Sequence, residues 1–446
     1  QEFIRKNKGR LSARQMARQL GVDRRLIEAS LGETPDPAST PTAPASPTRP
    51  LPAWLPPLVL LAVHVAVFFG HYFEGVGFPN DFRLTAHAVP FHWITCVQSG
   101  FFPQWVPFQA MGYPLAMNLQ SDIYYPPLWT VVASGQAYSL KTAVVFQCLH
   151  VLAGAWGAYA LARRRGLAVS FALLAAIAYH GFGGFYSNAQ HVHIVRTYAL
   201  IPWVIAGLTF ARDKKLDLFQ VLCAPLAMYL LWTGGYTGGA LATLALGPLY
   251  VVCQLLGPGS HFEPSQWRRA ALAIGLLVAG TLLAAVQLVP AWIFREELLR
   301  YHDSAAQQMN FLSLRHLATL VAPYLTEGLP LDPSMRSVFV SAPVLIGLVY
   351  ATRRTFSDHF PLYALCAAAL LVVTGSPLYA LLSRLLPPLG YSRFPSADFR
   401  ALLVLPVVVL AAAHFERLLT DRAPLAGTAV RLGAGAAAAI GLCALL

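Results

Sequence analysis

Residues 138–165 read YSLKTAVVFQCLHVLAGAWGAYALARRR, and this stretch decides the fold. Up to residue 162 it contains one Lys and no Arg, Asp or Glu. A helix needs roughly 20 apolar residues to cross the ~30 Å hydrocarbon core of a bilayer, so the run is long enough to span it. The three arginines that follow, Arg163–Arg165, are typical of the cytoplasmic end of such a helix.

The composition of the whole chain points the same way. Of its 446 residues 56% are hydrophobic and 12% are charged, and the charged share is about half of that in an average soluble domain. The 32 Lys and Arg against 20 Asp and Glu give a net charge of +12. Cytoplasmic loops of membrane proteins collect Lys and Arg, so we interpret this excess as a topology signal and consider a nucleic-acid partner unlikely.

Similar apolar runs recur along the chain and predict an all-α, polytopic bundle of about eleven transmembrane helices. The expected runs are 53–73, 138–162, 167–186, 197–211, 216–234, 236–256, 269–290, 337–352, 359–374, 399–416 and 426–446. The spans contain almost no Asp, Glu, Lys or Arg, which argues against a proton- or ion-coupled transporter.

Basic residues predict the orientation of the bundle. With the N-terminus in the cytosol, most cytoplasmic connections carry a basic pair or triplet, as at 163–165, 212–215 and 353–354. The first outer loop, from 71 to 140, contains Arg83 as its only Lys or Arg. The sequence therefore predicts large outer loops at about 74–137 and 291–336, with function on that face. The aromatic and proline residues of the first outer loop predict helices lying in the membrane interface.

Two carboxylates stand out in the first outer loop, Asp81 and Asp122. A carboxylate just after the first span suits a general base that takes a proton from an acceptor hydroxyl. The alternative for Asp81 is a solvated residue that caps a helix, as the sequence Asn80-Asp81 allows.

Further candidate site residues lie in two other outer segments. His191, His193 and Arg196 cluster between the third and fourth spans, where they form either a weak metal site, a set of interfacial residues or part of a phosphate site. Arg393 and Arg400 lie at the outer edge of a later span. An arginine there either binds phosphate oxygens with its planar fork or extends to lipid headgroups.

The order of several motifs resembles a known family. The chain has GYPLAMNLQSDIYYPPLW at 112–129, HVHIVRTYALIPWV at 191–204, QLVPAW at 287–292, SVFVSAPVLIGLVYA at 337–351 and LLPPLGYSRFPSADFR at 385–400. With Asp81 ahead of them, residues 53–420 resemble the YfhO-like bacterial membrane proteins of the GT-C glycosyltransferase superfamily.

The resemblance implies a fold of many membrane helices with interfacial helices in the first extracytoplasmic loop. It also implies inverting transfer of a sugar from a polyprenyl-phosphate donor to an acceptor outside the cytoplasm, in the bacterial cytoplasmic membrane. Asp81 would be the general base, with Asp122, His191 and His193 supporting it or positioning the acceptor. Arg393 would contact the donor phosphate with help from Arg400 and Arg196. The residues assign no metal ligands, and a divalent metal ion is compatible with the reaction.

The N-terminal part predicts a separate cytosolic unit. Residues 1–33 resemble a small helix-turn-helix, with Ser12 and Asp23 as candidate helix caps and Gly21 in the turn. We favour docking of a cytosolic protein over DNA binding. Residues 34–52 form a Pro-rich linker, so the membrane domain would cover 53–446. Two other functions stay open: a flippase for lipid-linked glycans that performs no chemistry, and a membrane-anchored regulator.

Overall fold

A computed structural model gives the structure of the chain. It describes residues 52–109, 111–210, 217–257, 264–297, 310–323, 328–329, 332–340 and 342–420. The predicted unit at 1–33, the linker up to residue 51 and the expected span at 426–446 lie outside the described residues, and these predictions remain untested.

The described residues are almost entirely helical, which confirms the all-α prediction. The helices that start before residue 200 are α4 (Leu55–Val67), α5 (Phe69–Phe73), the π-helical turn η2 (Arg83–Ala88), α6 (Val89–Gln98), η3 (Leu115–Met117), α7 (Pro126–Ser134), α8 (Leu140–Arg164), α9 (Val169–His180), α10 (Gly183–Ser187) and α11 (Val192–Leu208). The later helices are α12 (Leu218–Gly234), α13 (Thr237–Leu256), α14 (Pro264–Leu283), α15 (Ala285–Ile293), η4 (Arg295–Glu297), η5 (Leu314–Leu320), η6 (Pro333–Met335), α17 (Ala342–Leu348), α18 (Arg353–Asp358), α19 (Phe360–Val373), α20 (Pro377–Leu385), η7 (Pro387–Tyr391) and α21 (Pro395–Thr420).

One small antiparallel ribbon interrupts the helices in the first outer loop. Strand β1 (Trp105–Val106) pairs with β2 (Tyr113–Pro114), with Trp105 opposite Pro114. Short helices α6 and α7 flank it in the sequence. Phe101, Phe102 and Phe108 are exposed here, so the loop presents aromatic rings of the kind expected at a membrane interface.

The predicted count of about eleven spans is not met. Four helices in the described part of the chain are long and apolar enough to cross a membrane: α8, Val169–Ser187 (α9 with α10), α13 and α21. The count rises to six if the bent pairs α14–α15 (65°) and α19–α20 (94°) each form one span.

Helix length is the reason for the smaller count. Helix α4 has 13 residues, and α11 and α12 have 17 each, less than the roughly 20 that a straight span requires. In the apolar run at 337–352 only the seven residues of α17 are helical. The apolar composition of these runs therefore did not determine whether each forms a helix long enough to cross the membrane.

Helix α11 lies at the centre of the bundle, and 16 of its 17 residues are buried. It packs against α8 and α12 at positions where glycines allow the backbones to approach. A Cβ added at Gly157 of α8 would lie 2.8 Å from Cβ of Pro202, and one at Gly207 would lie 2.7 Å from the backbone nitrogen of Ala224. Small residues at helix contacts are the usual means of close packing between membrane helices.

Helix α14 provides a matched test of this packing. A Cβ at Gly280 would lie 2.5 Å from the carbonyl oxygen of Pro225 in α12, whereas one at Gly275 meets nothing within 4 Å. We expect Gly280→Ala to destabilise the protein by about 1–3 kcal/mol through overpacking. Gly275→Ala on the same helix should be neutral or slightly stabilising. Thermal unfolding of both variants in one detergent measures the difference, and equal midpoints would contradict it.

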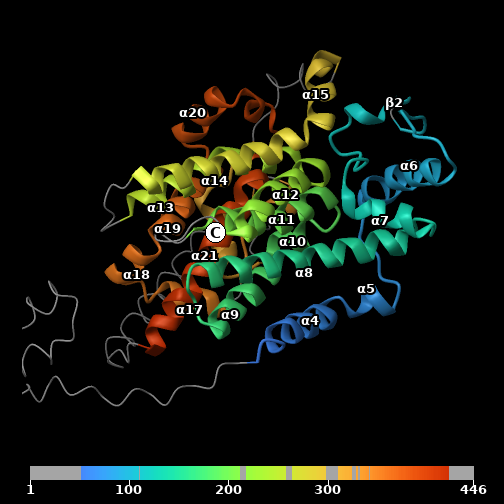
Figure 1. Cartoon of the computed structure of the whole chain (residues 1–446). Helices are drawn as coiled ribbons and strands as arrows, with labels where there is room; N and C mark the ends of the chain where they lie inside the picture. The colour runs from blue at the N-terminus through green and yellow to red at the C-terminus, as the bar shows by residue number, and fades with distance from the viewer. Residues whose placement is uncertain are drawn as a thin grey trace, which may run out of the picture. The chain divides into compact units, whose positions relative to one another are not determined.

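The two ends of the bundle are formed by different elements, as Figure 1 shows. At one end of α8 lie α5, α6, α7 and β2; α9, α17 and α18 lie toward the other. Ion pairs at the second end join Arg164 to Asp217 (3.0 Å) and Arg417 to Asp358 (2.9 Å). Basic connections that the sequence predicted to share one side of a membrane thus come together, while the assignment of this end to the cytosol remains a prediction.

Candidate functional site

The first turn of α11, at the end of the bundle opposite those ion pairs, brings together residues that the sequence suggested separately. His191 is the N-cap residue of α11, and its backbone N–H donates to the carbonyl of Asn188 at 2.7 Å. Its Nε2 lies 3.9 Å from Oδ2 of Asp81. That distance is too long for a hydrogen bond, so the Asp81 carboxylate and the His191 imidazole face each other without a direct hydrogen bond.

A hydrogen bond between the preceding residues, Asn80 and Gln190, joins the turn that carries Asp81 to the turn that carries His191. Asn80 has the left-handed backbone φ of 48° that Asn tolerates well, and its Nδ2 donates to Oε1 of Gln190 at 2.8 Å. At the start of the η2 turn, the backbone carbonyl oxygen of Asp81 accepts a hydrogen bond from the backbone N–H of Thr85 at 2.9 Å. The Asp81 side chain caps nothing and is 63% exposed, so a solvent molecule or substrate can reach its carboxylate.

His191 is held in its neutral form. Burial lowers its pKa most strongly, and the carboxylates of Asp81 and Asp332 oppose that effect only in part. A neutral imidazole has one nitrogen that accepts a proton. His191 therefore places an uncharged imidazole opposite the Asp81 carboxylate.

Behind this exposed pair lies a fully buried ionic cluster. Oδ1 of Asp122 accepts from Nε2 of His193 at 3.0 Å, and Oδ2 accepts from Nη1 of Arg196 at 2.6 Å. The Asp122 side chain has no exposed surface, and that of Arg196 is 1% exposed. Nη1 of Arg196 also donates to the carbonyl of Gly234 at 3.3 Å, so the cluster ties the first outer loop to α11 and to the end of α12.

Asp122 is ionised in this cluster. Burial alone would raise its pKa, but the Arg196 guanidinium and then His193 outweigh burial and bring the pKa below the ordinary carboxyl value. Since the cluster is covered, the predicted acceptor-side role of Asp122 and His193 would act through position rather than contact. One donor of Arg196, Nε, has no acceptor among the described residues.

Arg400 is likewise committed to the protein interior. It is fully buried, and its guanidinium donates to the hydroxyl of Tyr198 at 2.8 Å and to the carbonyl of Ser337 at 2.8 Å. It also contacts the carbonyl of Ser334 at 3.3 Å. These bonds hold the loop at 332–340 against α11 and α21, so a phosphate could reach Arg400 only if that loop opened.

The same loop supplies a residue that the sequence analysis missed. Oδ1 of Asp332 accepts from the backbone N–H (2.8 Å) and the hydroxyl (2.6 Å) of Ser334. Burial raises the pKa of Asp332, but these hydrogen bonds and nearby positive charge lower it overall. The motif Asp332-Pro333-Ser334 is a helix N-cap with proline in the first turn, and it was readable in the sequence, although its electrostatic effect on His191 was not.

Arg393 is placed differently from the other predicted arginines. Its side chain is exposed, and its guanidinium carbon lies 5.3 Å from the centre of the Phe394 ring. Its backbone carbonyl accepts from Asn310 N–H at 3.2 Å. Of the three arginines predicted to bind a donor phosphate, Arg393 is thus the accessible one.

No metal site emerges in the part of the chain that the structure describes, where no group of three or more His, Cys, Asp or Glu side chains could hold an ion. His191 and His193 face different carboxylates, Asp81 and Asp122. The described residues therefore supply no set of candidate ligands for the divalent metal ion.

Within the residues that the structure describes, the fold and the site define a helical bundle with four to six candidate membrane spans and an ionic cluster at one end. No protein-family model, no curated protein and no solved structure matches the chain.

Proposed function

We propose that the chain is a membrane glycosyltransferase that moves a sugar from a polyprenyl-phosphate donor to an acceptor on the extracytoplasmic side of the bacterial cytoplasmic membrane. The observation that carries the proposal is the position of Asp81. Its carboxylate is 63% exposed and lies 3.9 Å from Nε2 of His191. The same segment of the chain carries the exposed aromatic residues Phe101, Phe102 and Phe108. The motif resemblance to GT-C enzymes supplies the reaction class, although the span count differs from the expected eleven.

In the proposed reaction, an acceptor hydroxyl binds beside Asp81 and loses its proton to the carboxylate. The hydroxyl oxygen attacks the anomeric carbon of the sugar and forms the new glycosidic bond with inversion. The bond between that carbon and the phosphate oxygen breaks, and the polyprenyl phosphate leaves with the electron pair. Arg393 is the accessible cation for the charge on this leaving group.

The neighbouring residues have positioning roles in this proposal. His191 faces Asp81, and because its imidazole is neutral it places no positive charge beside the Asp81 carboxylate. The buried ion pair of Asp122 and Arg196, together with His193, fixes the turn that carries His191. Because binding a lipid-linked donor in a membrane restricts its motion to the reacting geometry, much of the rate gain would come from orientation.

An assay in proteoliposomes separates this function from that of a flippase. The full chain is reconstituted with a polyprenyl-phosphate sugar that is labelled in the sugar, and an acceptor is supplied outside. The transferase forms a labelled product containing a new glycosidic bond. Movement of intact donor across the bilayer without such a product would refute transfer and favour the flippase. Parallel reactions with EDTA test the predicted divalent metal.

A further inference from the structure

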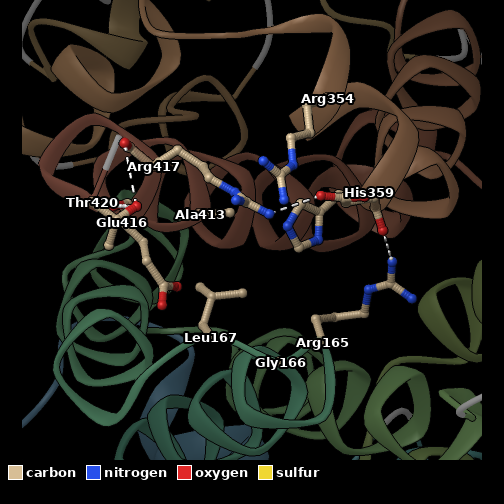
Figure 2. Close-up of a pocket in the computed structure, with 10 residues that line it drawn as sticks. Arg165, Gly166, Leu167, Arg354, His359, Ala413, Glu416, Arg417 and Thr420 are labelled. Atoms are coloured by element: carbon tan, nitrogen blue, oxygen red, sulfur yellow. Dashed lines mark hydrogen bonds and ion pairs between the residues drawn. The ribbon is translucent and has the colours of Figure 1, made fainter. Parts of the chain in front are cut away.

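A second site lies at the end of the bundle opposite Asp81. A cavity of about 590 Å³ opens between the loop before α9, the α18–α19 junction and the last turns of α21. Its lining includes Arg165, Arg354, His359, Glu416 and Arg417, and Figure 2 shows their side chains directed around one space. The volume is within the range of about 300–1,000 Å³ that is typical of small-molecule sites.

The negative charges of this cavity already have partners. Oδ2 of Asp358 accepts from Nη2 of Arg417 at 2.9 Å. The carboxylate of Glu416 accepts from the backbone N–H of Ala168 at 3.1 and 3.3 Å, just before α9 begins. The Asp358 charge is thus paired with Arg417, whereas the backbone N–H of Ala168 leaves the charge of Glu416 in place. The three arginines of the lining, Arg165, Arg354 and Arg417, still outnumber the two carboxylates, Asp358 and Glu416.

The positive charges are not all engaged. Arg165 donates through Nη2 to the backbone carbonyl of Asp358 at 2.6 Å, but its buried Nε has no hydrogen-bond partner among the described residues. The exposed side chain of Arg354 makes no ion pair with any residue that the structure describes. In Figure 2 its guanidinium points toward that of Arg417 and toward His359. Like charges gathered in this way favour an anion between them.

His359 provides independent support for a ligand. It is 7% exposed and lines the cavity, and its Nδ1 has no hydrogen-bond partner in the described structure. A buried polar atom normally has a partner, so an unused one in a cavity wall indicates a missing group. Burial is the largest cause that lowers the pKa of His359 to about 3, and the nearby Arg165, His414 and Arg417 add to it.

We propose that this cavity binds a phosphate group. The guanidinium of Arg354 would be the principal contact, and Arg165 and His359 would be further hydrogen-bond donors. An arginine fork matches two phosphate oxygens at once. The phosphate would belong either to an anionic phospholipid headgroup or to a soluble phosphate compound. The site is separate from the transfer site at Asp81 and does not depend on the proposed glycosyltransferase activity.

The neighbouring arginines of α18 allow a matched test. Arg353 and Arg354 are both exposed, but only Arg354 lines the cavity. The full chain, with Arg354→Gln or Arg353→Gln, is placed in phosphatidylcholine nanodiscs, and its unfolding midpoint is followed while inorganic phosphate or pyrophosphate is added at constant ionic strength. In the second arm the nanodiscs contain increasing phosphatidylglycerol. A ligand that binds the folded state raises the midpoint in a saturable way.

We expect saturation in one arm, which then identifies the source of the phosphate. Arg354→Gln should weaken that binding by about ten-fold or more, the loss of one charge-assisted contact, while Arg353→Gln leaves it within about two-fold. Arg354→Lys, which keeps the charge but not the fork, should fall between them. No saturation in either arm, or equal weakening by Arg353→Gln and Arg354→Gln, would overturn the proposal. Unchanged midpoints without ligand confirm that the variants are folded.

Discussion

An Asp81→Asn variant is expected to fold normally and to transfer sugar about 10²–10⁴-fold more slowly, because the amide cannot accept the proton of the acceptor hydroxyl. The side chain is 63% exposed and caps no helix, so the substitution removes no structural contact except the 3.9 Å approach to His191. The rate with saturating labelled donor in proteoliposomes measures the effect.

Glu74→Gln is the matched control for this variant. Glu74 is a second exposed carboxylate in the same outer loop, and its neutralisation should leave the transfer rate within about two-fold of wild type, as is usual for a surface change away from the chemistry. If Asp81→Asn retained full activity, Asp81 would not be the base. If both variants lost activity equally, the charge of the loop rather than one proton acceptor would be responsible.

Neutralising Asp122 is expected to produce the largest loss of stability in the protein. Asp122→Asn leaves the buried Arg196 guanidinium and His193 without their carboxylate. Removing one partner of a buried ion pair typically costs about 3–5 kcal/mol. Chemical or thermal unfolding of the variant in detergent measures this loss.

The exposed pair of Arg164 and Asp217 supplies the control. Asp217 is 52% exposed and caps α12 through Gln220 N–H. Because Asn caps a helix as well as Asp does, Asp217→Asn removes only the surface ion pair, for which about 0–1 kcal/mol is expected. A loss at Asp122 as small as that at Asp217 would mean that the cluster does not hold the site together.

The same cluster predicts how stability changes with pH. The pKa of Asp122 is lower in the folded protein than its ordinary value. Its contribution to stability is therefore complete above about pH 4, the ordinary carboxyl value, and is lost as the pH falls further toward the folded-state pKa. Asp122→Asn should remove this part of the acid dependence, which unfolding at pH 3 and pH 6 can test.

A double variant distinguishes the structural from the catalytic role of the cluster. Replacing Asp122 by Asn and Arg196 by Met together removes both buried charges and leaves no uncompensated guanidinium in the interior. Asn also tolerates the left-handed backbone φ of 61° at position 122. We expect this variant to recover much of the stability that Asp122→Asn loses. Recovery of transfer activity as well would show that Asp122 and Arg196 serve only to position α11, whereas stability without activity would assign them a role in the reaction.

The sequence alone determined the all-helical class, the long helix at 140–164 and the grouping of the basic connections, because each depends on local composition and on the period of apolar residues. It also selected Asp81 and His191 as candidates, although it could not show that they face each other across 110 residues of chain.

Only the tertiary structure decided what the other candidates do. Arg196 and Arg400 have the same chemistry as Arg393, yet two are buried against partners as many as 202 residues away and one is exposed. The span count was overestimated because the apolar composition of a run does not set the length of the helix that it forms, as the 13 residues of α4 and the seven of α17 show. The cavity around Arg354 is formed by three segments distant in sequence, so local pattern contained no trace of it.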